Sequence, residues 1–215
     1  MSTDVTTDRP MRADAARNRD RVLAAASELF AEVGLRAGIE DIARRAGVGV
    51  GTVCRNFPAK EALVEAVVSA LWRSLLDAAV AALAAPDPGP AFEQFVYVIA
   101  EFQAKHRALA EEMAAEINLP IRDQVRQDLH AAISQLVARA QAVGTLRTDI
   151  GPADVAMLLS GVAHAATLAG DVDPRLRDRF VRIVLDGLRP LDPTPLPGRA
   201  LDFAGLEASR SRGRR

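Results

Sequence analysis

The stretch numbered 39–57 reads IEDIARRAGVGVGTVCRNF, and its spacing of small and apolar residues decides the fold. The small side chain of Ala43 lets two helices cross closely, and Gly47 falls where the turn between them favours a positive φ. Val53 and Phe57 then face the core from the second helix. These are the geometric demands of a helix-turn-helix, whose second helix is free to enter the major groove of DNA.

Apolar residues recur at helical spacing on both sides of this stretch, and no segment shows a strand pattern. Glycine and proline mark where most of the periodic segments stop or start. We expect helices at about 18–33, 39–46, 50–57, 60–84, 92–102, 109–117, 120–140, 152–166 and 174–188. The predicted fold class is all-α with about nine helices, comprising an N-terminal three-helix helix-turn-helix domain and a larger C-terminal helical domain.

The same pattern predicts four segments of different character. The polar start of the chain and the proline-rich, arginine-ending tail lack a periodic apolar stripe, so we expect both to be disordered. The predicted organisation is a disordered arm over 1–13, a DNA-binding domain over 14–60 with its motif at 38–57, a helical domain over 61–189, and a basic tail over 190–215.

Composition and charge restrict the class of protein further. Hydrophobic residues make up 49% of the 215 residues and aromatic ones only 4%, so the apolar bulk suits helices. The net charge is −1, yet the segment 42–60 carries four basic residues and no acidic one, namely Arg44, Arg45, Arg55 and Lys60. A basic patch on a neutral protein fits docking on a polyanion, although an unevenly charged solvated surface is the alternative.

Cysteine content and hydropathy indicate the compartment. Cys54 is the only cysteine, so no internal disulfide forms. The N-terminus lacks the basic-then-apolar order of a signal peptide. The longest uncharged run, 155–170, is shorter than the roughly 20 residues that a membrane span needs. We therefore expect a soluble, cytoplasmic protein without a membrane partner.

The run of residues 21–68, RVLAAASELFAEVGLRAGIEDIARRAGVGVGTVCRNFPAKEALVEAVV, resembles the DNA-binding domain of the TetR family of transcriptional regulators. The matching elements are the first helix ending in glycine, the IARRAGV segment, the GT pair, the phenylalanine and KEAL. The resemblance implies a homodimeric repressor that binds a palindromic double-stranded operator and releases it when a small molecule binds.

The resemblance and the helical register together select the residues expected at DNA. The predicted contacts are Gly49, Val50, Gly51, Thr52, Cys54, Arg55, Asn56 and Lys60, with Arg55 able to reach guanine and Val50 a thymine methyl. Four positions depart from the family pattern. Cys54 stands in place of the usual tyrosine and Asn56 in place of a frequent histidine. Gly38 offers no capping hydroxyl, and Gly49 replaces a frequent serine. These departures weaken the expected contacts with the DNA backbone.

The C-terminal domain carries two further predicted sites. An effector pocket among the central helices would be lined by Trp72, Phe92, Phe95, Phe102, Gln103, His106 and Met113, which could equally be core residues. A dimer seam would use the last two helices through Leu158, Leu159, Gly161, Val162, Ala165, Phe180, Ile183 and Val184, whose apolar surface is costly to expose on a monomer.

Several alternatives compete with the repressor hypothesis. The chain could be an activator without a ligand, or a helical ligand-binding or redox-responsive regulator with a weakened helix-turn-helix. A redox role would use Cys54, although a small half-buried filler is the simpler interpretation. The sequence holds no nucleotide-binding loop, nucleophile motif or metal-ligand spacing, so we predict no enzymatic activity, no cofactor and no metal.

Overall fold

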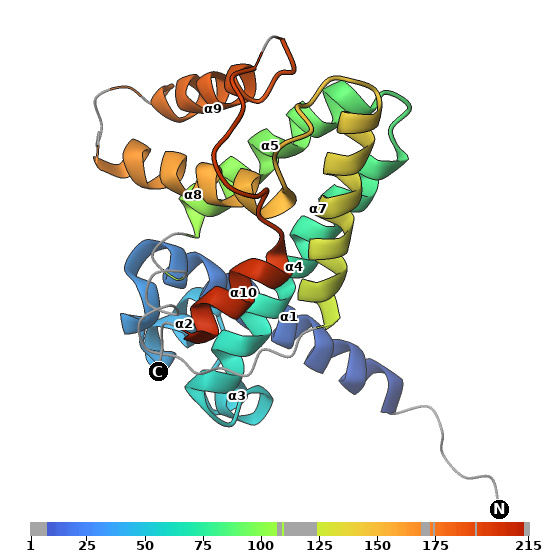
Figure 1. Ribbon diagram of the computed structural model, residues 1–215. Helices are drawn as coiled ribbons and strands as arrows, with labels where there is room; N and C mark the ends of the chain where they lie inside the picture. The colour runs from blue at the N-terminus through green and yellow to red at the C-terminus, as the bar shows by residue number, and fades with distance from the viewer. Residues whose placement is uncertain are drawn as a thin grey trace, which may run out of the picture. The chain divides into compact units, whose positions relative to one another are not determined.

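The computed structural model describes residues 8–106, 109, 124–168, 173, 175–191 and 193–212. Over these residues the chain forms α-helices and one short 3-10 helix, with no strand (Figure 1). The helices are α1 (Asp8–Val33), α2 (Ile39–Ala46), α3 (Val50–Asn56), α4 (Lys60–Ala84), α5 (Pro88–Lys105), α7 (Gln124–Ala142), α8 (Pro152–Leu168), α9 (Leu176–Gly187) and α10 (Phe203–Arg212). The predicted all-α fold class is confirmed. The helix predicted at 109–117 lies outside the described residues, apart from position 109.

The chain divides into two compact units. The first takes residues 1–71 and 108–121, and the second takes residues 72–107 and 122–215. Helix α4 contributes residues to both. The sequence analysis predicted the end of the DNA-binding domain at residue 60, the first residue of this helix.

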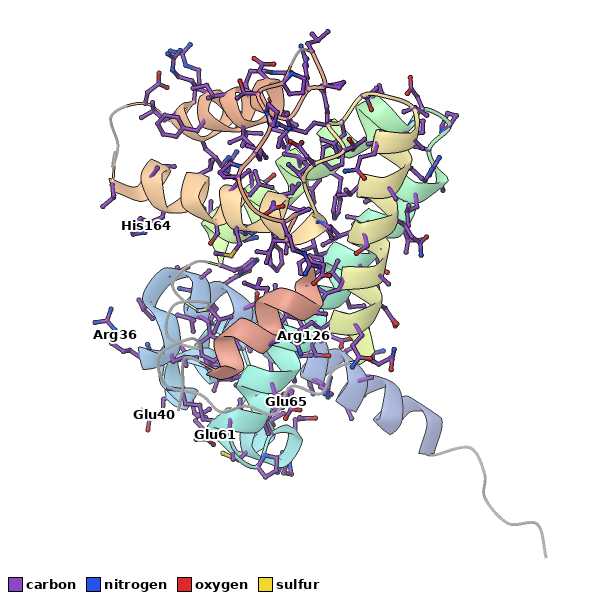
Figure 2. The ribbon with its side chains drawn as sticks, viewed as in Figure 1. Arg36, Glu40, Glu61, Glu65, Arg126 and His164 are labelled. Atoms are coloured by element: carbon purple, nitrogen blue, oxygen red, sulfur yellow. The ribbon has the colours of Figure 1, made fainter. Side chains whose placement is uncertain are left out.

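The core of the first unit forms where α1, α2 and α3 meet. Val22 and Phe30 of α1, Ile42 of α2 and Val53 of α3 have no exposed surface. In contrast, the side chain of Arg36, which follows α1 in a 3-10 turn, points away from this core into solvent, as does that of Glu40 at the start of α2 (Figure 2). The stripe predicted from the apolar spacing is therefore the buried face.

An ion pair fixes α2 against α1. The guanidinium of Arg45 donates from Nη1 to Oε1 of Glu32 at 2.5 Å and from Nη2 to Oε2 at 2.9 Å. Hydrogen bonding to Arg45 lowers the pKa of Glu32. Two parallel hydrogen bonds restrict rotation as well as distance, so the pair orients the helix that precedes the recognition turn.

The ends of the first helices follow the glycine signals. Gly34 after α1 has φ 66° and Gly47 after α2 has φ 64°, the left-handed conformation expected of a glycine at a helix C-terminus. The start of α1 differs from expectation, because the helix begins at Asp8 and not near residue 18. The arm predicted to be disordered over 1–13 therefore overlaps α1 from residue 8 onward.

The second unit has its own hydrophobic core, centred on α5. Helix α5 packs against α7, α8 and α9, and its residues Phe95, Val96 and Ile99 are buried among them. Asp87 caps α5 by accepting a hydrogen bond from the Gly89 amide at 3.3 Å, and Pro88 occupies the first helical position. This core is large enough to make the second unit a rigid support for a binding surface.

The chain after α9 differs most from its sequence prediction. We expected disorder from residue 190 onward, but the described residues of 190–212 form a hydrogen-bonded segment that leads into α10. A proline-rich composition predicts disorder because it lacks a periodic apolar stripe. The segment is ordered here because side chains about 47 residues earlier in the chain form hydrogen bonds with its backbone.

One helix among the described residues, α4, is long and apolar enough to cross a membrane by length and composition. A helix that packs into the core of a globular protein passes the same test. The α4 residues Leu63 and Val67, and farther along Leu75 and Ala79, are buried within the folded chain. In total, 22% of the apolar window of α4 is buried within the described structure.

Candidate nucleic-acid interface

Helix α3 presents one buried and one open face. Val53 is fully buried, and Phe57 at its C-terminal end is buried as well. The opposite face carries Val50, Gly51, Cys54 and Arg55, all exposed, with 43% of the Val50 surface accessible. The residues of α3 predicted to face the core and those predicted to face outward therefore do so in the structure. The exposed face has the width of a single helix, which fits the major groove.

The turn before α3 is held by backbone and arginine contacts. The Val48 amide donates to the Ala43 carbonyl at 3.0 Å, which closes α2. Nη2 of Arg21 donates to the Gly47 carbonyl at 3.1 Å, and a Cβ on Gly47 would lie 2.6 Å from the same nitrogen. The guanidinium of Arg19 lies 5.0 Å from the centre of the Phe57 ring, in cation–π geometry.

Arg19 and Arg21 are thus cations of α1 at the two ends of the recognition segment. Neither arginine belongs to the basic patch predicted within 42–60. Their position beside the apolar stripe of α1, which begins at Val22, was an available signal, since charged residues beside such a stripe lie on the solvent face of a helix.

The polar side chains of α3 contact one another. Nη2 of Arg55 donates to Oγ1 of Thr52 at 3.1 Å, and Nδ2 of Asn56 donates to the Thr52 carbonyl at 2.8 Å. Thr52 and Asn56 are half-buried, whereas Arg55 is exposed. A hydrogen bond between Arg55 and a neutral hydroxyl is readily exchanged for a stronger one to a base or phosphate.

The basic patch expected over 42–60 is mostly paired within the chain. Arg45 binds Glu32, and Nη2 of Arg44 lies 3.1 Å from Oδ1 of Asp41. The ammonium of Lys60, predicted to hold a phosphate, donates to the Leu35 carbonyl and is half-buried. Lys60 is therefore first a structural residue that ties α4 to the turn after α1. Its remaining donors stay available to a phosphate.

Cys54 is exposed. The interpretation that it is a half-buried filler is therefore wrong for this structure, because its position on α3 points away from Val53 and the core. Among the residues that the structure describes, no group of three or more potential ligands could hold a metal ion.

Glycines replace the usual capping and helix-forming residues around α3. Gly38 and Gly49 occupy the N-cap positions of α2 and α3, and neither helix has a side-chain cap. Gly51 lies inside α3, where a Cβ would meet only Nη1 of Arg55, at 4.0 Å. No contact within the chain requires a glycine at this position, so its open space faces outward.

This contrast predicts opposite effects for two alanine substitutions. Gly51→Ala should stabilise the first unit by about 1 kcal/mol, the helix-propensity difference between glycine and alanine. Gly47→Ala should instead destabilise it by about 1–2 kcal/mol, because alanine is strained at positive φ and its Cβ collides with Arg21. Urea denaturation of the two variants measures both effects. A stabilised Gly47→Ala protein would contradict the proposed geometry of the turn.

Comparisons with known proteins agree with this helix arrangement. The family model for bacterial regulatory proteins of the tetR family matches residues 22–67, and the model for SbtR-like transcriptional regulators, C-terminal domain, matches 87–190. A TetR transcription regulatory protein from Mycobacterium vanbaalenii is 38% identical, with a TM-score of 0.65 over 84% of this chain and 99% of that one. The chain belongs to the TetR family. A TetR regulator from Streptomyces coelicolor is 35% identical, with a TM-score of 0.64 over 80% of this chain and 98% of that one.

Membership of the TetR family makes α2 and α3 the helix-turn-helix of a transcriptional regulator. Regulators of this family are generally DNA-binding proteins and not enzymes. A γ-butyrolactone receptor described as ArpA-like shares the fold, with 19% identity and a TM-score of 0.61 over 83% of this chain and 91% of that one. The search of curated proteins finds no match.

The predicted effector residues lie in several different environments. Phe92 and Phe95 are buried in the core of the second unit, and Phe102 packs against it. Trp72 is half-buried, with the Arg126 guanidinium 5.9 Å from its ring centre. Gln103 and His106 lie near the C-terminal end of α5, and Met113 lies outside the described residues.

The predicted dimer residues differ in how far they are exposed. Leu158, Gly161, Ala165 and Ile183 are exposed on α8 and α9, and Phe180 and Val184 are half-buried against the core. Leu159 and Val162 are instead buried within the unit. Helix α8 is apolar on all sides, so its spacing does not show which residues face inward. Leu159 and Val162 therefore belong to the core and not to a seam.

Proposed function

We propose that this TetR-family chain is a cytoplasmic repressor that binds a palindromic operator through α3 and leaves it when a small, largely apolar molecule binds the second unit. The DNA-binding part of this proposal is supported by the solvent-exposed face of α3. Val50, Gly51, Cys54 and Arg55 are exposed there, while Val53 holds the helix to the core. An exposed apolar and arginine surface suits contact with base edges.

Two arginines of α1 complete the proposed DNA surface. Arg19 and Arg21 lie beside Phe57 and Gly47, at either end of the recognition segment. Contacts from this position would fix the register of α3 on the duplex while Arg55 reads a base. The test is fluorescence anisotropy of full-length protein with operator DNA over a series of salt concentrations. Binding that does not weaken with salt would contradict phosphate contacts.

The observation that supports a ligand is a pair of unpartnered polar atoms at the end of α5. Oε1 of Gln103 and Nδ1 of His106 are both buried and have no hydrogen-bond partner. The Gln103 amide nitrogen donates to the Ala156 carbonyl at 3.3 Å, so its oxygen is directed elsewhere. The rings of Phe102 and His106 lie 4.9 Å apart.

Buried polar atoms without partners cost free energy unless a ligand supplies one. Burial lowers the pKa of His106, which keeps the imidazole neutral. The site therefore favours an uncharged, mostly apolar molecule that carries a hydrogen-bond donor for Gln103. We propose that this molecule is the effector, and that the continuous helix α4, which contributes to both units, transmits its binding to α3.

A substitution at His106 tests the ligand proposal. His106→Phe should stabilise the free protein by about 1 kcal/mol, because it removes an unpartnered buried polar atom, and should abolish the response to effector. Chemical denaturation measures the first effect, and release of operator DNA measures the second. The exposed His164, which projects from α8 (Figure 2), provides the control His164→Gln, expected to change stability by less than about 0.5 kcal/mol. A destabilised His106→Phe protein would show that the imidazole is already satisfied.

We propose that the repressor acts as a homodimer through α8 and α9. Leu158 and Ile183 are large apolar side chains with 45% and 57% of their surface exposed, and both lie on this face. Exposed apolar surface of this kind marks a contact with another protein. A two-fold dimer presents two copies of α3 to successive major grooves, which a palindromic operator requires.

A further inference from the structure

The chain crosses back over the second unit after α9. The segment 190–202, here called the C-terminal strap, runs from the end of α9 beside α8 to the start of α10 (Figure 1). The Ala153 amide of α8 donates to the Leu201 carbonyl at 3.1 Å, and the ring of Phe203 stacks on that of His130 at 3.9 Å. The far end of the strap is therefore anchored on both α8 and α7.

Three side chains between α7 and the first turn of α8 bind the backbone of the strap. Nη2 of Arg147 donates to the Thr194 carbonyl at 2.8 Å. The carboxylate of Asp149 accepts from the Leu196 amide at 3.3 Å, and that of Asp154 accepts from the Leu201 amide at 2.9 Å. Hydrogen bonding to Arg147 lowers the pKa of Asp149 to about 2. Asp149 therefore remains ionised and able to accept throughout the neutral range.

Gly151 is an independent sign that the sequence accommodates the strap. A Cβ on Gly151 would lie 2.1 Å from the Leu201 carbonyl oxygen and 2.8 Å from its carbonyl carbon. Both neighbours are backbone atoms, so a larger residue would displace the strap. Gly151 does not have a positive φ, so its backbone conformation does not require a glycine. The close approach of the Leu201 backbone does.

The strap, α8 and α9 enclose a groove of about 620 Å³. Its walls include Met157 and Leu158 from α8, Ile183 from α9 and Leu196 from the strap. Each of these four side chains is between 45% and 57% exposed. The groove is thus a concave continuation of the surface proposed for the dimer.

Two features favour a second copy of the chain over a small ligand in this groove. Its charged residues are two arginines, Arg147 and Arg199, and two aspartates, Asp149 and Asp154, so the groove has no excess of one sign to repel an identical surface. No buried polar atom without a partner lies among its lining residues, in contrast to the end of α5. The groove therefore offers no unpaired buried donor or acceptor that would orient a small molecule.

Gly161 adds room for a neighbouring chain. It lies within α8, lines the groove, and has no heavy atom within 4 Å of an added Cβ. A glycine inside a helix costs about 1 kcal/mol relative to alanine, and its lack of a side chain leaves space in which a neighbouring chain can approach the backbone of α8.

We infer that the C-terminal strap is a wall of the interface between two copies of this chain, and that Leu196 contacts the partner copy. This inference rests on the proposed homodimer. The strap extends the contact surface beyond α8 and α9, and Arg147, Asp149 and Asp154 act as positioning residues for it.

The test compares two leucines of the same segment. Leu196 lines the groove, whereas Leu191 is 82% exposed and lies outside it. Leu196→Asp should raise the dimer dissociation constant at least about tenfold, because an unpaired charge would be buried against apolar side chains. Leu191→Asp should leave it within about twofold. Sedimentation velocity over a concentration series of full-length protein gives these constants, and circular dichroism confirms that both variants fold.

Each result has a distinct meaning. Equal dimer affinity for Leu196→Asp and the unaltered chain would overturn the role of the strap while leaving the homodimer intact. A monomeric unaltered chain would overturn both. If instead 1-decanol stabilises the unaltered chain but not Leu196→Asp, and the dimer is unchanged, the groove holds a small apolar molecule and the inference is wrong. Gly151→Ala, which displaces the strap, should weaken the dimer in the same direction as Leu196→Asp.

Discussion

Replacing Arg55 by alanine is expected to weaken operator binding by about 10- to 100-fold, or about 1–3 kcal/mol. Arg55 is the exposed cation of α3, and its hydrogen bond in the free protein is to the neutral Thr52 hydroxyl. Contact with a guanine would exchange that bond for two charge-assisted ones. The measurement is anisotropy titration with operator DNA and with a duplex altered at the base that Arg55 reads. The variant should no longer distinguish the two duplexes.

Two further arginines serve as controls for this substitution. Arg44 of α2 is exposed and pairs with Asp41 at 3.1 Å, so Arg44→Ala should affect all DNA sequences equally and lower the salt slope by about one at most. Arg175 belongs to the second unit, so Arg175→Ala removes the same charge without altering the helix-turn-helix. If Arg55→Ala weakened specific and random DNA by the same factor, Arg55 would be a phosphate contact and not a base reader.

Phe30→Ala is expected to destabilise the first unit by about 3–5 kcal/mol and to abolish operator binding at elevated temperature. Phe30 has no exposed surface and is among the largest fully buried side chains of the chain. Truncation leaves a cavity where α1 packs on α2, and the position of α3 depends on that packing. Urea denaturation gives the loss of stability, and anisotropy over a temperature series gives the loss of binding.

Phe30→Leu provides the matched control, because it keeps most of the apolar volume. It should cost less than about 1.5 kcal/mol and retain operator binding. Met157→Ala removes an exposed side chain of the second unit, so it should leave the stability of the first unit within about 0.5 kcal/mol. Equal losses for Phe30→Ala and Phe30→Leu would contradict a tightly packed core around α1.

The sequence was sufficient to predict the recognition segment because its constraints are local. Gly47 permits the left-handed turn between the two helices, and the helical spacing of Val53 and Phe57 determines which face of α3 is buried. The same reasoning placed Val50 and Arg55 on the open face of α3. Side-chain partners were not predictable in this way, since Lys60 bonds to the Leu35 carbonyl across 25 positions.

The second unit was harder to derive from the sequence for two physical reasons. Helix α8 is apolar on every side, so its periodicity did not distinguish the buried Leu159 from the exposed Leu158. The ordering of the segment after α9 depends on long-range bonds from Arg147 and Asp154, which composition does not reveal. A retrospective signal was the cluster of charged residues around Gly151, namely Arg147, Asp149 and Asp154.

The arrangement of the two units suggests a division of function within one chain. The first holds a DNA-reading helix against a rigid core, and the second holds two unpartnered polar atoms and an apolar groove. We assign these features to the operator, the effector and the partner copy respectively. The effector assignment rests on different residues from the other two, whereas the palindromic operator requires the partner copy.

Selection of binding sites from a pool of random double-stranded DNA, using the full-length protein, shows whether the chain reads a symmetric operator through α3. We expect enrichment of a palindrome whose half-sites are separated by about one helical turn or a multiple of it, with loss of enrichment for Arg55→Ala. Recovery of no common sequence, or of a single half-site without its symmetric partner, would contradict a dimeric repressor that reads DNA through α3.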